Sequence, residues 1–272
     1  MPPRIEGGGS GTTAGHAQAL ARGLALLETL AATDAGATLT ALAAALGLPT
    51  PTAHRLLAAL GQAGFVEQDD HGVWRIGVRA FRVGSAFLEQ RNLTAQTLPR
   101  LHQLMEQSGE TANLAVPSEG EVVFIAQVQC RELMRMSVKL GARAPMHASG
   151  AGKAILSALD PRGLDREIGR MGLARYTDNT IVERDALQAE LRASRERGYA
   201  VDDEEHARGL RCVAAPILDE HGQPWAALSL AGPTGRLTPA RVAALGALVA
   251  AAARDVTAAL GGRAAPAAAT TR

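Results

Sequence analysis

The chain has 272 residues, which is enough for two domains of roughly 100–200 residues each. Hydrophobic residues make up 47% of it and charged residues 20%, a composition that fits a packed globular protein and excludes wholesale disorder. The formal net charge is +1, so bulk charge indicates neither a nucleic-acid nor a membrane partner, and two cysteines are too few for a disulfide framework or a four-cysteine zinc site.

The ends of the chain predict neither a signal peptide nor a membrane anchor. Residues 1–15 are rich in small and polar residues and lack an apolar core, and the longest apolar run, Val242–Ala253, is shorter than the about 20 residues that a membrane span needs. We therefore expect a cytoplasmic protein with no membrane partner. Residues 1–15 and 261–272 are predicted to be disordered tails.

Three helices are predicted at the start of the first domain. Apolar residues at helical spacing indicate helices over about 16–32 and 39–46. The third has the clearest start, because Thr50 suits an N-cap and Pro51 suits the first helical position. Two short helices joined by a tight turn at Gly47–Pro49 form a helix-turn-helix pattern.

Two short strands follow, over residues 65–68 and 73–76, around a four-residue turn. A hairpin that comes after a helix-turn-helix indicates a wing. Residues 16–77 are thus predicted to form a winged helix-turn-helix DNA-binding domain, and residues 78–91 a linking helix whose apolar face includes Val78 and Phe81. This face could pair with its counterpart in a dimer.

The outward side chains of the third helix are the candidates for contact with double-stranded operator DNA. Thr, His and Arg side chains at its N-terminal end suit phosphates and base edges, and an arginine of the hairpin joins them. The candidates are Thr50, Thr52, His54, Arg55 and Arg75. Because residues 20–85 hold equal numbers of arginines and acidic residues, specific binding should depend on a dimer.

Residues 92–260 are predicted to form the second domain, an antiparallel sheet flanked by helices. The predicted strands are 112–116, 121–128, 133–138, 199–202, 211–218 and 225–231, and the predicted helices are 94–108, 150–159, 161–169, 183–197 and 239–260. The fold class is therefore α+β.

One helix start in this domain suits an anion. Ser149 can cap the helix that begins at Gly150, which leaves the backbone N–H groups of Gly150, Ala151 and Gly152 free for a carboxylate. A phosphate-binding P-loop is excluded, because His147 and Ala154 occupy positions where that motif needs a glycine and a hydroxyl residue.

Three runs of residues resemble the IclR family of transcriptional regulators. LTALAAALGLPTPTAHRLLAALGQAGFV resembles the family's helix-turn-helix, and MSVKLGARAPMHASGAGKAIL and RGYAVDDEEHARGLRCVAAPILDEHGQPWAALSLAGPTGRLT resemble its effector domain. The resemblance covers about residues 17–260 and is nearest to repressors of acetate (glyoxylate-bypass) metabolism. It implies a GAF-like effector domain, a homodimer that can pair into a tetramer, and effectors such as glyoxylate or pyruvate.

The same resemblance implies which residues contact the effector. They are Gly150, Ala151, Asp202, Cys212 and Ser229, with Met136 and Leu210 as apolar walls. Two positions depart from close relatives, since Ala231 stands where they carry a second serine and Ala144 where they carry leucine. We expect a ligand other than glyoxylate, or weaker glyoxylate binding by about 1 kcal/mol for the lost hydrogen bond.

Three other functions are alternatives to a repressor. Cys212, His206 and Asp202 have the side-chain types of a thiol enzyme or a metal sensor, but a buried cysteine is usually a small hydrophobe. We expect no catalytic residue, no metal site and no cofactor. An activator of an aromatic or sugar-acid catabolic operon, with a larger carboxylate effector, remains the alternative.

Overall fold

The computed structural model describes residues 13–33, 35–89 and 93–263, and most of both predicted tails lies outside them. The chain divides into two compact units, residues 1–91 and 92–272. The predicted α+β class, a winged helix-turn-helix followed by a domain with an antiparallel sheet, is confirmed.

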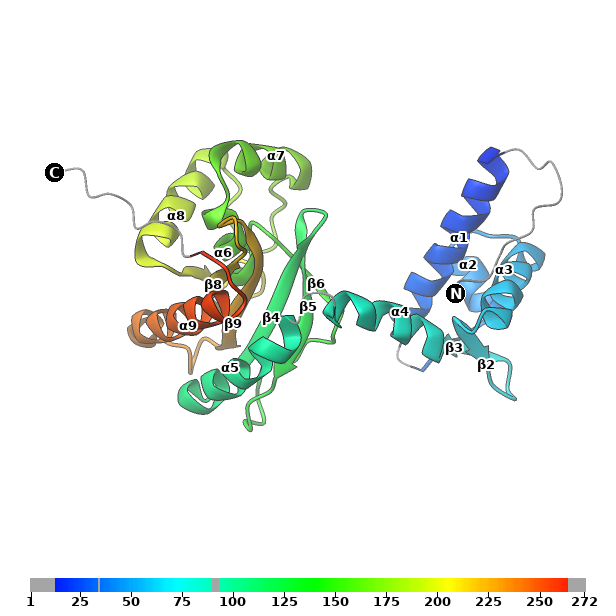
Figure 1. Cartoon of the computed structure of the whole chain (residues 1–272). Coiled ribbons are helices and arrows are strands. Elements are labelled where there is room, and N and C mark those ends of the chain that lie inside the picture. Colours follow the sequence, from blue (N-terminus) through cyan, green and yellow to red (C-terminus); the bar gives the residue numbers. More distant parts are fainter. Residues whose placement is uncertain (1–12, 34, 90–92, 264–272) are drawn as a thin grey trace. The chain divides into compact units, whose positions relative to one another are not determined.

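The first unit contains four helices and three short strands among its described residues (Figure 1). Its elements are α1 (Thr13–Ala31), β1 (Ala37–Thr38), α2 (Leu39–Ala45), α3 (Thr50–Gln62), β2 (Val66–Gln68), β3 (Val73–Ile76) and α4 (Val78–Glu89). A small core fixes α1, α2 and α3 on the hairpin, and it is built from Leu26, Leu30, Leu42, Leu57, Val66 and Trp74. The predicted hairpin β2–β3 is present, but β1, which pairs with β3, was not predicted.

The start of α3 differs from the prediction in one detail. Pro49 occupies the N-cap position, and Thr50 and Pro51 both lie in the first turn. The Thr50 side chain therefore caps nothing, because it lies one residue inside the helix, where it is exposed. A proline in the first turn costs no hydrogen bond, since its missing N–H would have no partner there.

The second unit is a six-stranded antiparallel sheet with helices on both faces (Figure 1). Its elements are α5 (Leu93–Ser108), β4 (Thr111–Ser118), β5 (Glu121–Val128), β6 (Arg143–Pro145), α6 (Gly150–Ala158), α7 (Pro161–Met171), α8 (Arg184–Arg197), β7 (Ala200–Asp203), β8 (Leu210–Leu218), β9 (Pro224–Pro233) and α9 (Pro239–Ala259). The strand order is β6-β5-β4-β9-β8-β7.

Two apolar clusters fill the two faces of this sheet. One joins the sheet to α5 and α9, and the other joins it to α6, α7 and α8. Among the described residues, α9 is the one helix long and apolar enough to cross a membrane, a test that the core helix of a globular domain also passes. Leu245, Val249, Ala253 and Val256 of α9 are buried in the first cluster, so this helix is part of the core.

The predicted strand over residues 133–138 is wrong. This segment has no ladder partner, and Leu133 is 97% exposed. Side chains hold its backbone instead, since Thr111 Oγ1 donates to the Met136 carbonyl at 2.9 Å and Arg236 Nη1 donates to the Met134 carbonyl at 2.7 Å. The edge strand that pairs with β5 is β6, which begins five residues after the end of the predicted strand.

Candidate functional site

The N-terminus of α6 presents backbone amides at the centre of the second unit. Ser149 is the N-cap, as predicted, and its Oγ accepts from the Gly152 N–H at 3.2 Å and donates to the Pro145 carbonyl at 2.7 Å. The prediction that the Gly152 N–H is free is therefore wrong, because the cap uses it. Gly150 and Ala151 keep N–H groups with no acceptor inside the helix, which is the arrangement that binds carboxylates at helix N-termini.

Glycine is required here because other elements come close. A Cβ atom at Gly150 would lie 2.7 Å from Cys212 Sγ, and one at Gly152 would lie 2.3 Å from the backbone of Met146. The first contact brings the amide end of α6 directly over β8. The α6 N-terminus thus forms one wall of a site whose floor is the sheet.

The sheet register places three polar or sulfur-bearing side chains under that helix end. Asp202 of β7 pairs with Cys212 of β8, and Cys212 pairs with Ala231 of β9. Directly paired residues of antiparallel strands point to the same face, and so do residues two apart on one strand. Ser229 of β9 therefore shares this face, and Leu210 of β8 shares it as well.

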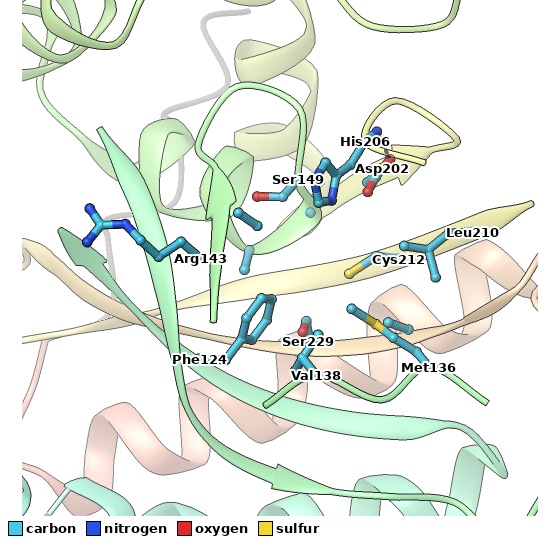
Figure 2. Close-up of a pocket in the computed structure, with 14 residues that line it drawn as sticks. Phe124, Met136, Val138, Arg143, Ser149, Asp202, His206, Leu210, Cys212 and Ser229 are labelled. Atoms are coloured by element: carbon cyan, nitrogen blue, oxygen red, sulfur yellow. Dashed lines mark hydrogen bonds between the residues drawn. The ribbon is translucent and has the colours of Figure 1, made fainter. Parts of the chain in front are cut away.

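All seven predicted effector residues line one cavity (Figure 2). They come from the 136–138 segment, from α6 and from β7, β8 and β9. Ala144 and Ala231, the two positions expected to alter the pocket, also line the cavity. So do five residues that were not predicted as ligand contacts, namely Phe124, Val138, Arg143, Ser149 and His206. The strict alternation of burial in β5 places Phe124 on the cavity side, a signal that the sequence pattern contains.

The cavity is small and mostly closed to solvent. Its volume is about 50 Å³, against roughly 10–15 Å³ for a single ordered water. Ala151, Asp202, Ser229 and Ala231 are all 2% exposed or less. Such a space suits a ligand of a few heavy atoms with one anionic end at the α6 amides.

The acidic side chain at the cavity is held by the chain's own amides. Asp202 Oδ1 accepts from the Glu205 N–H at 2.8 Å and from the His206 N–H at 3.4 Å. Burial raises the pKa of Asp202 to about 7, and the nearby Glu205 carboxylate adds to the rise. A carboxyl group in this setting changes between its protonated and ionised forms near neutral pH.

A buried lysine supports the same loop from α6. Lys153 is 1% exposed, and its Nζ forms an ion pair with Glu205 Oε1 and a longer one, of 3.7 Å, with Glu190 Oε1. Burial raises the pKa of Glu205, against the lowering effect of Lys153. The lysine charge is thus balanced within the protein.

Two histidines and a tyrosine lie together beside the cavity. The ring centroids of His147 and Tyr176 are 5.9 Å apart, and those of Tyr176 and His206 are 5.5 Å apart with the rings nearly perpendicular. Burial lowers the pKa of both histidines. At neutral pH they are uncharged imidazoles, so they add no cation to the site.

The geometry argues against the thiol-enzyme and metal-sensor alternatives. Burial raises the pKa of Cys212 to about 12, so its thiol carries no nucleophilic thiolate at neutral pH. Within residues 13–33, 35–89 and 93–263, no group of three His, Cys, Asp or Glu side chains is arranged to hold a metal ion. Asp202, His206 and Cys212 all line the cavity.

The candidate DNA surface lies on α3 of the first unit. Thr50, His54 and Arg55 are exposed, and Thr52 is half-buried. Arg55 forms no hydrogen bond or ion pair with any other residue that the structure describes, so its guanidinium is available to a ligand. The candidate in the wing, Arg75, is half-exposed and pairs with Asp69 at 2.8 Å.

The acidic side chain of the wing turn is engaged by backbone N–H groups and by Arg75. Asp69 Oδ1 accepts from the Val73 N–H at 2.9 Å and from the His71 N–H at 3.0 Å, and these bonds hold the pKa of Asp69 below its usual range. Its other oxygen faces Arg75. Asp69 is therefore a turn-forming residue, which reduces the repulsion that an acidic wing tip would exert on phosphate.

Comparison with known proteins agrees with both halves of this description. Residues 19–70 match the model of the IclR helix-turn-helix domain, and residues 85–258 match that of the bacterial transcriptional regulator IclR C-terminal domain. The chain is 51% identical to the transcriptional repressor IclR of Escherichia coli over 251 residues, which cover 91% of this chain and 92% of that one. It is 52% identical to the acetate operon repressor of Salmonella typhimurium, with the same coverage.

Solved structures give the same fold. An IclR homologue from Microbacterium hydrocarbonoxydans in complex with 4-hydroxybenzoate superposes with a TM-score of 0.79 at 26% identity, covering 89% of this chain and 98% of that one. The IclR protein of Thermotoga maritima superposes with a TM-score of 0.75 at 26% identity, covering 90% of this chain and all of that one.

Proposed function

This chain belongs to the IclR family of transcriptional regulators, and from that premise we propose that it is a repressor whose operator binding is modulated by a small carboxylate in the α6 cavity. The observation that carries the proposal is a cavity lined both by Gly150 and Ala151, at the N-terminus of α6, and by Ser229 of β9. In the same arrangement Asp202 and Cys212 contact the rest of the ligand, and Met136 and Leu210 form apolar walls. Family members are regulators and not enzymes.

The size of the cavity favours glyoxylate- or pyruvate-like acids. A volume of about 50 Å³ corresponds to a few water-sized atoms, on the scale of about 10–15 Å³ for each. A relative that is 52% identical is named for repression of an acetate operon, which fits two- and three-carbon acids. The alternative, an activator with an aromatic or sugar-acid effector, is less well supported, although a relative at 26% identity binds 4-hydroxybenzoate.

Operator recognition is assigned to α3 and the wing. Thr50, Thr52, His54 and Arg55 would contact bases and phosphates at the N-terminal end of α3, and Arg75 would contact phosphate from the wing. Because residues 20–85 are net neutral, a single unit would bind weakly. Two units on one operator would add their contacts.

A homodimer would supply those two units, and two helices of the first unit offer apolar faces for it. Leu20 and Leu24 of α1 are 66% and 51% exposed, and Val78 and Phe81 of α4 are 73% and 72% exposed. Exposed apolar groups of this kind on neighbouring helical turns are typical of an interface. We assign them to a homodimer in the cytoplasm, which could pair into a dimer of dimers.

Footprinting on the DNA upstream of the protein's own gene tests the proposal. The wild-type chain should protect a two-fold symmetric site, and pyruvate or glyoxylate should change the protection. Protection without two-fold symmetry would contradict the dimer, and protection unaffected by both acids would contradict the proposed ligand class. Thermal unfolding with each acid gives a second readout, since a ligand that binds the native state raises its stability.

A further inference from the structure

Asp202 is a buried acid in a cavity that we assign to an anion, and this inference rests on that proposed function. It is 2% exposed, and both backbone donors that reach it, the N–H groups of Glu205 and His206, bind the same atom, Oδ1. No other hydrogen bond to the Asp202 side chain occurs among the described residues. Two negative groups in one buried cavity would repel each other strongly.

The charges around Asp202 do not offset that repulsion. The charge of Lys153 on α6 lowers the pKa of Asp202, but Lys153 is bound to Glu205 and lies within 3.7 Å of Glu190, and burial outweighs its effect. The neighbouring imidazoles, His147 and His206, are neutral because burial lowers the pKa of each. From β8, Cys212 contributes an uncharged thiol.

One cation lines the cavity among the described residues, and it is engaged elsewhere. Arg143 donates from Nε to Glu121 at 2.5 Å and from Nη2 to the Ser118 carbonyl at 3.3 Å, with its side chain 43% exposed. Its guanidinium points away from the other lining residues (Figure 2). The site therefore offers a ligand carboxylate amides and a hydroxyl but no free positive charge.

We infer that Asp202 meets the ligand as a carboxylic acid, donates its proton in a hydrogen bond to the ligand, and so makes the pocket take up one proton with each carboxylate. The proton comes from solvent and stays on Asp202, with no covalent change in the ligand. This role makes Asp202 a specificity-determining residue. It selects acids whose second polar group is an acceptor, such as a 2-oxo group, over 2-amino acids, whose ammonium group would require an ionised partner.

The burial that raises the pKa of Asp202 to about 7 places this proton uptake in a measurable range. Binding that needs the protonated form weakens by about tenfold for each pH unit well above that pKa, so the pyruvate affinity should fall by roughly fiftyfold between pH 7 and pH 9. Pyruvate itself stays fully ionised over this range, so the ligand does not contribute to the change.

Calorimetry of pyruvate binding at pH 8 in buffers of different ionisation enthalpy counts the protons directly. We expect an uptake close to one proton per bound pyruvate by the full-length protein at pH 8, falling toward zero at pH 6. Tight pyruvate binding with no uptake at pH 8 would overturn the inference while leaving the proposed function standing. No binding of pyruvate or glyoxylate at any pH from 6 to 9 would overturn both.

The Asp202→Asn variant separates the two states of the acid. An asparagine amide keeps an acceptor for the Glu205 N–H and presents N–H donors to the ligand, as the carboxylic acid does. Its pyruvate affinity should therefore be independent of pH within about twofold, and at pH 9 it should exceed that of the wild type. If Asp202 instead accepts a hydrogen bond from the ligand as a carboxylate, this variant should lose affinity at every pH.

Asp203→Asn is the matched control, because Asp203 is exposed and pairs with Arg211 outside the cavity. It should retain the wild-type pH profile and the wild-type proton uptake. Circular dichroism of each variant checks that it is folded. A pH profile that Asp203→Asn flattens as much as Asp202→Asn would contradict a specific role for Asp202.

Discussion

At the scale of single residues, small side chains shape the ligand cavity. Gly150 lets α6 approach Cys212, Ala231 lies beside Cys212 on the sheet, and Ala144 forms part of the wall near Phe124. A larger residue at any of these three positions would reduce the space for a ligand. The two alanines are also the positions at which the resemblance predicts a departure from close relatives, so they are the first places to test for ligand selectivity.

Restoring a hydroxyl at position 231 should tighten binding of small 2-oxo acids. Ala231 is 1% exposed and its strand carries Ser229 on the same face, so Ala231→Ser would add a second donor to the cavity. We expect a gain of about 1 kcal/mol, or roughly fivefold in the dissociation constant for glyoxylate by calorimetry. Ala231→Cys adds an atom of similar size with a much weaker donor and should not give this gain. Tight glyoxylate binding by the wild type, unimproved by Ala231→Ser, would refute the expectation.

The buried acid should also make the stability of the protein depend on pH. The pKa of Asp202 is about 7 in the folded chain against a reference value of 3.8, so from about pH 4 to pH 7 the folded state holds a proton that the unfolded state releases. Stability therefore falls as the pH rises through this window, and it changes no further from this group above the folded pKa.

Asp202→Asn removes this dependence and so tests it without any ligand. The difference in unfolding free energy between the variant and the wild type should shift in favour of the variant by roughly 2–3 kcal/mol between pH 5 and pH 8. Urea denaturation at the two pH values measures it. A difference that is the same at both pH values would show that Asp202 is already ionised at pH 5.

At the scale of elements, α3 carries a guanidinium, that of Arg55, with no hydrogen bond or ion pair to another described residue. Arg55→Ala should lower operator affinity by about 1–3 kcal/mol if Arg55 reads a base, with specificity relaxed at one position of the operator. If it contacts phosphate instead, binding should weaken uniformly across sequences and the salt dependence should become shallower. Arg79→Ala is the comparison, because Arg79 already donates to the Ala63 carbonyl. Equal operator affinity of Arg55→Ala and the wild type would remove α3 from the interface.

The exposed face of α4 should be needed for dimer formation. Phe81→Glu places a charge on a side chain that is 72% exposed in the single chain, so it should leave the fold intact. We expect sedimentation to show a shift toward monomer, and operator affinity to fall by tenfold or more because two half-sites no longer bind together. Arg82→Lys, on the same helix, should behave like the wild type. A Phe81→Glu dimer with unchanged operator affinity would contradict the role of α4.

Most elements were predictable because their signals are local. Helix caps, apolar periodicity and the turn at residues 69–72 placed α1 to α6 and the hairpin within a few residues. The errors arose where contacts between residues far apart in the sequence determine the secondary structure. Met136 and Val138 have the apolar character of a strand, but they line the cavity. The edge strand is formed instead by Arg143–Pro145, whose register is set only by pairing with β5.

The cavity residues were predictable from family resemblance, whereas their electrostatics were not. Lys153, Glu205 and Asp202 lie far apart in sequence or on different elements, and only the fold brings them together. Sequence spacing gave no sign that Lys153 is buried, since lysine is rarely found in a protein core. The raised pKa of Asp202 follows from that packing.

At the scale of the whole molecule, the proposed function requires the second unit to influence the first. The chain is nearly neutral, so long-range charge is a weak link between the two units. The simplest physical link is a change in how the DNA-binding units of two chains pair in the dimer. A ligand can change operator affinity only by as much as its affinity differs between the two states.

Fluorescence anisotropy of a labelled operator, with and without pyruvate or glyoxylate, therefore tests the central claim most directly. The acid should change the operator dissociation constant of the wild type by about fivefold or more. It should have no effect on Gly150→Ala, whose Cβ would lie 2.7 Å from Cys212 Sγ, and at the same acid concentration it should have a weaker effect on Ser229→Ala, which loses one hydrogen bond to the acid. Gly169→Ala, where a Cβ meets nothing within 4 Å, should respond like the wild type. An equal response of all four proteins would contradict the assignment of the effector to the α6 cavity.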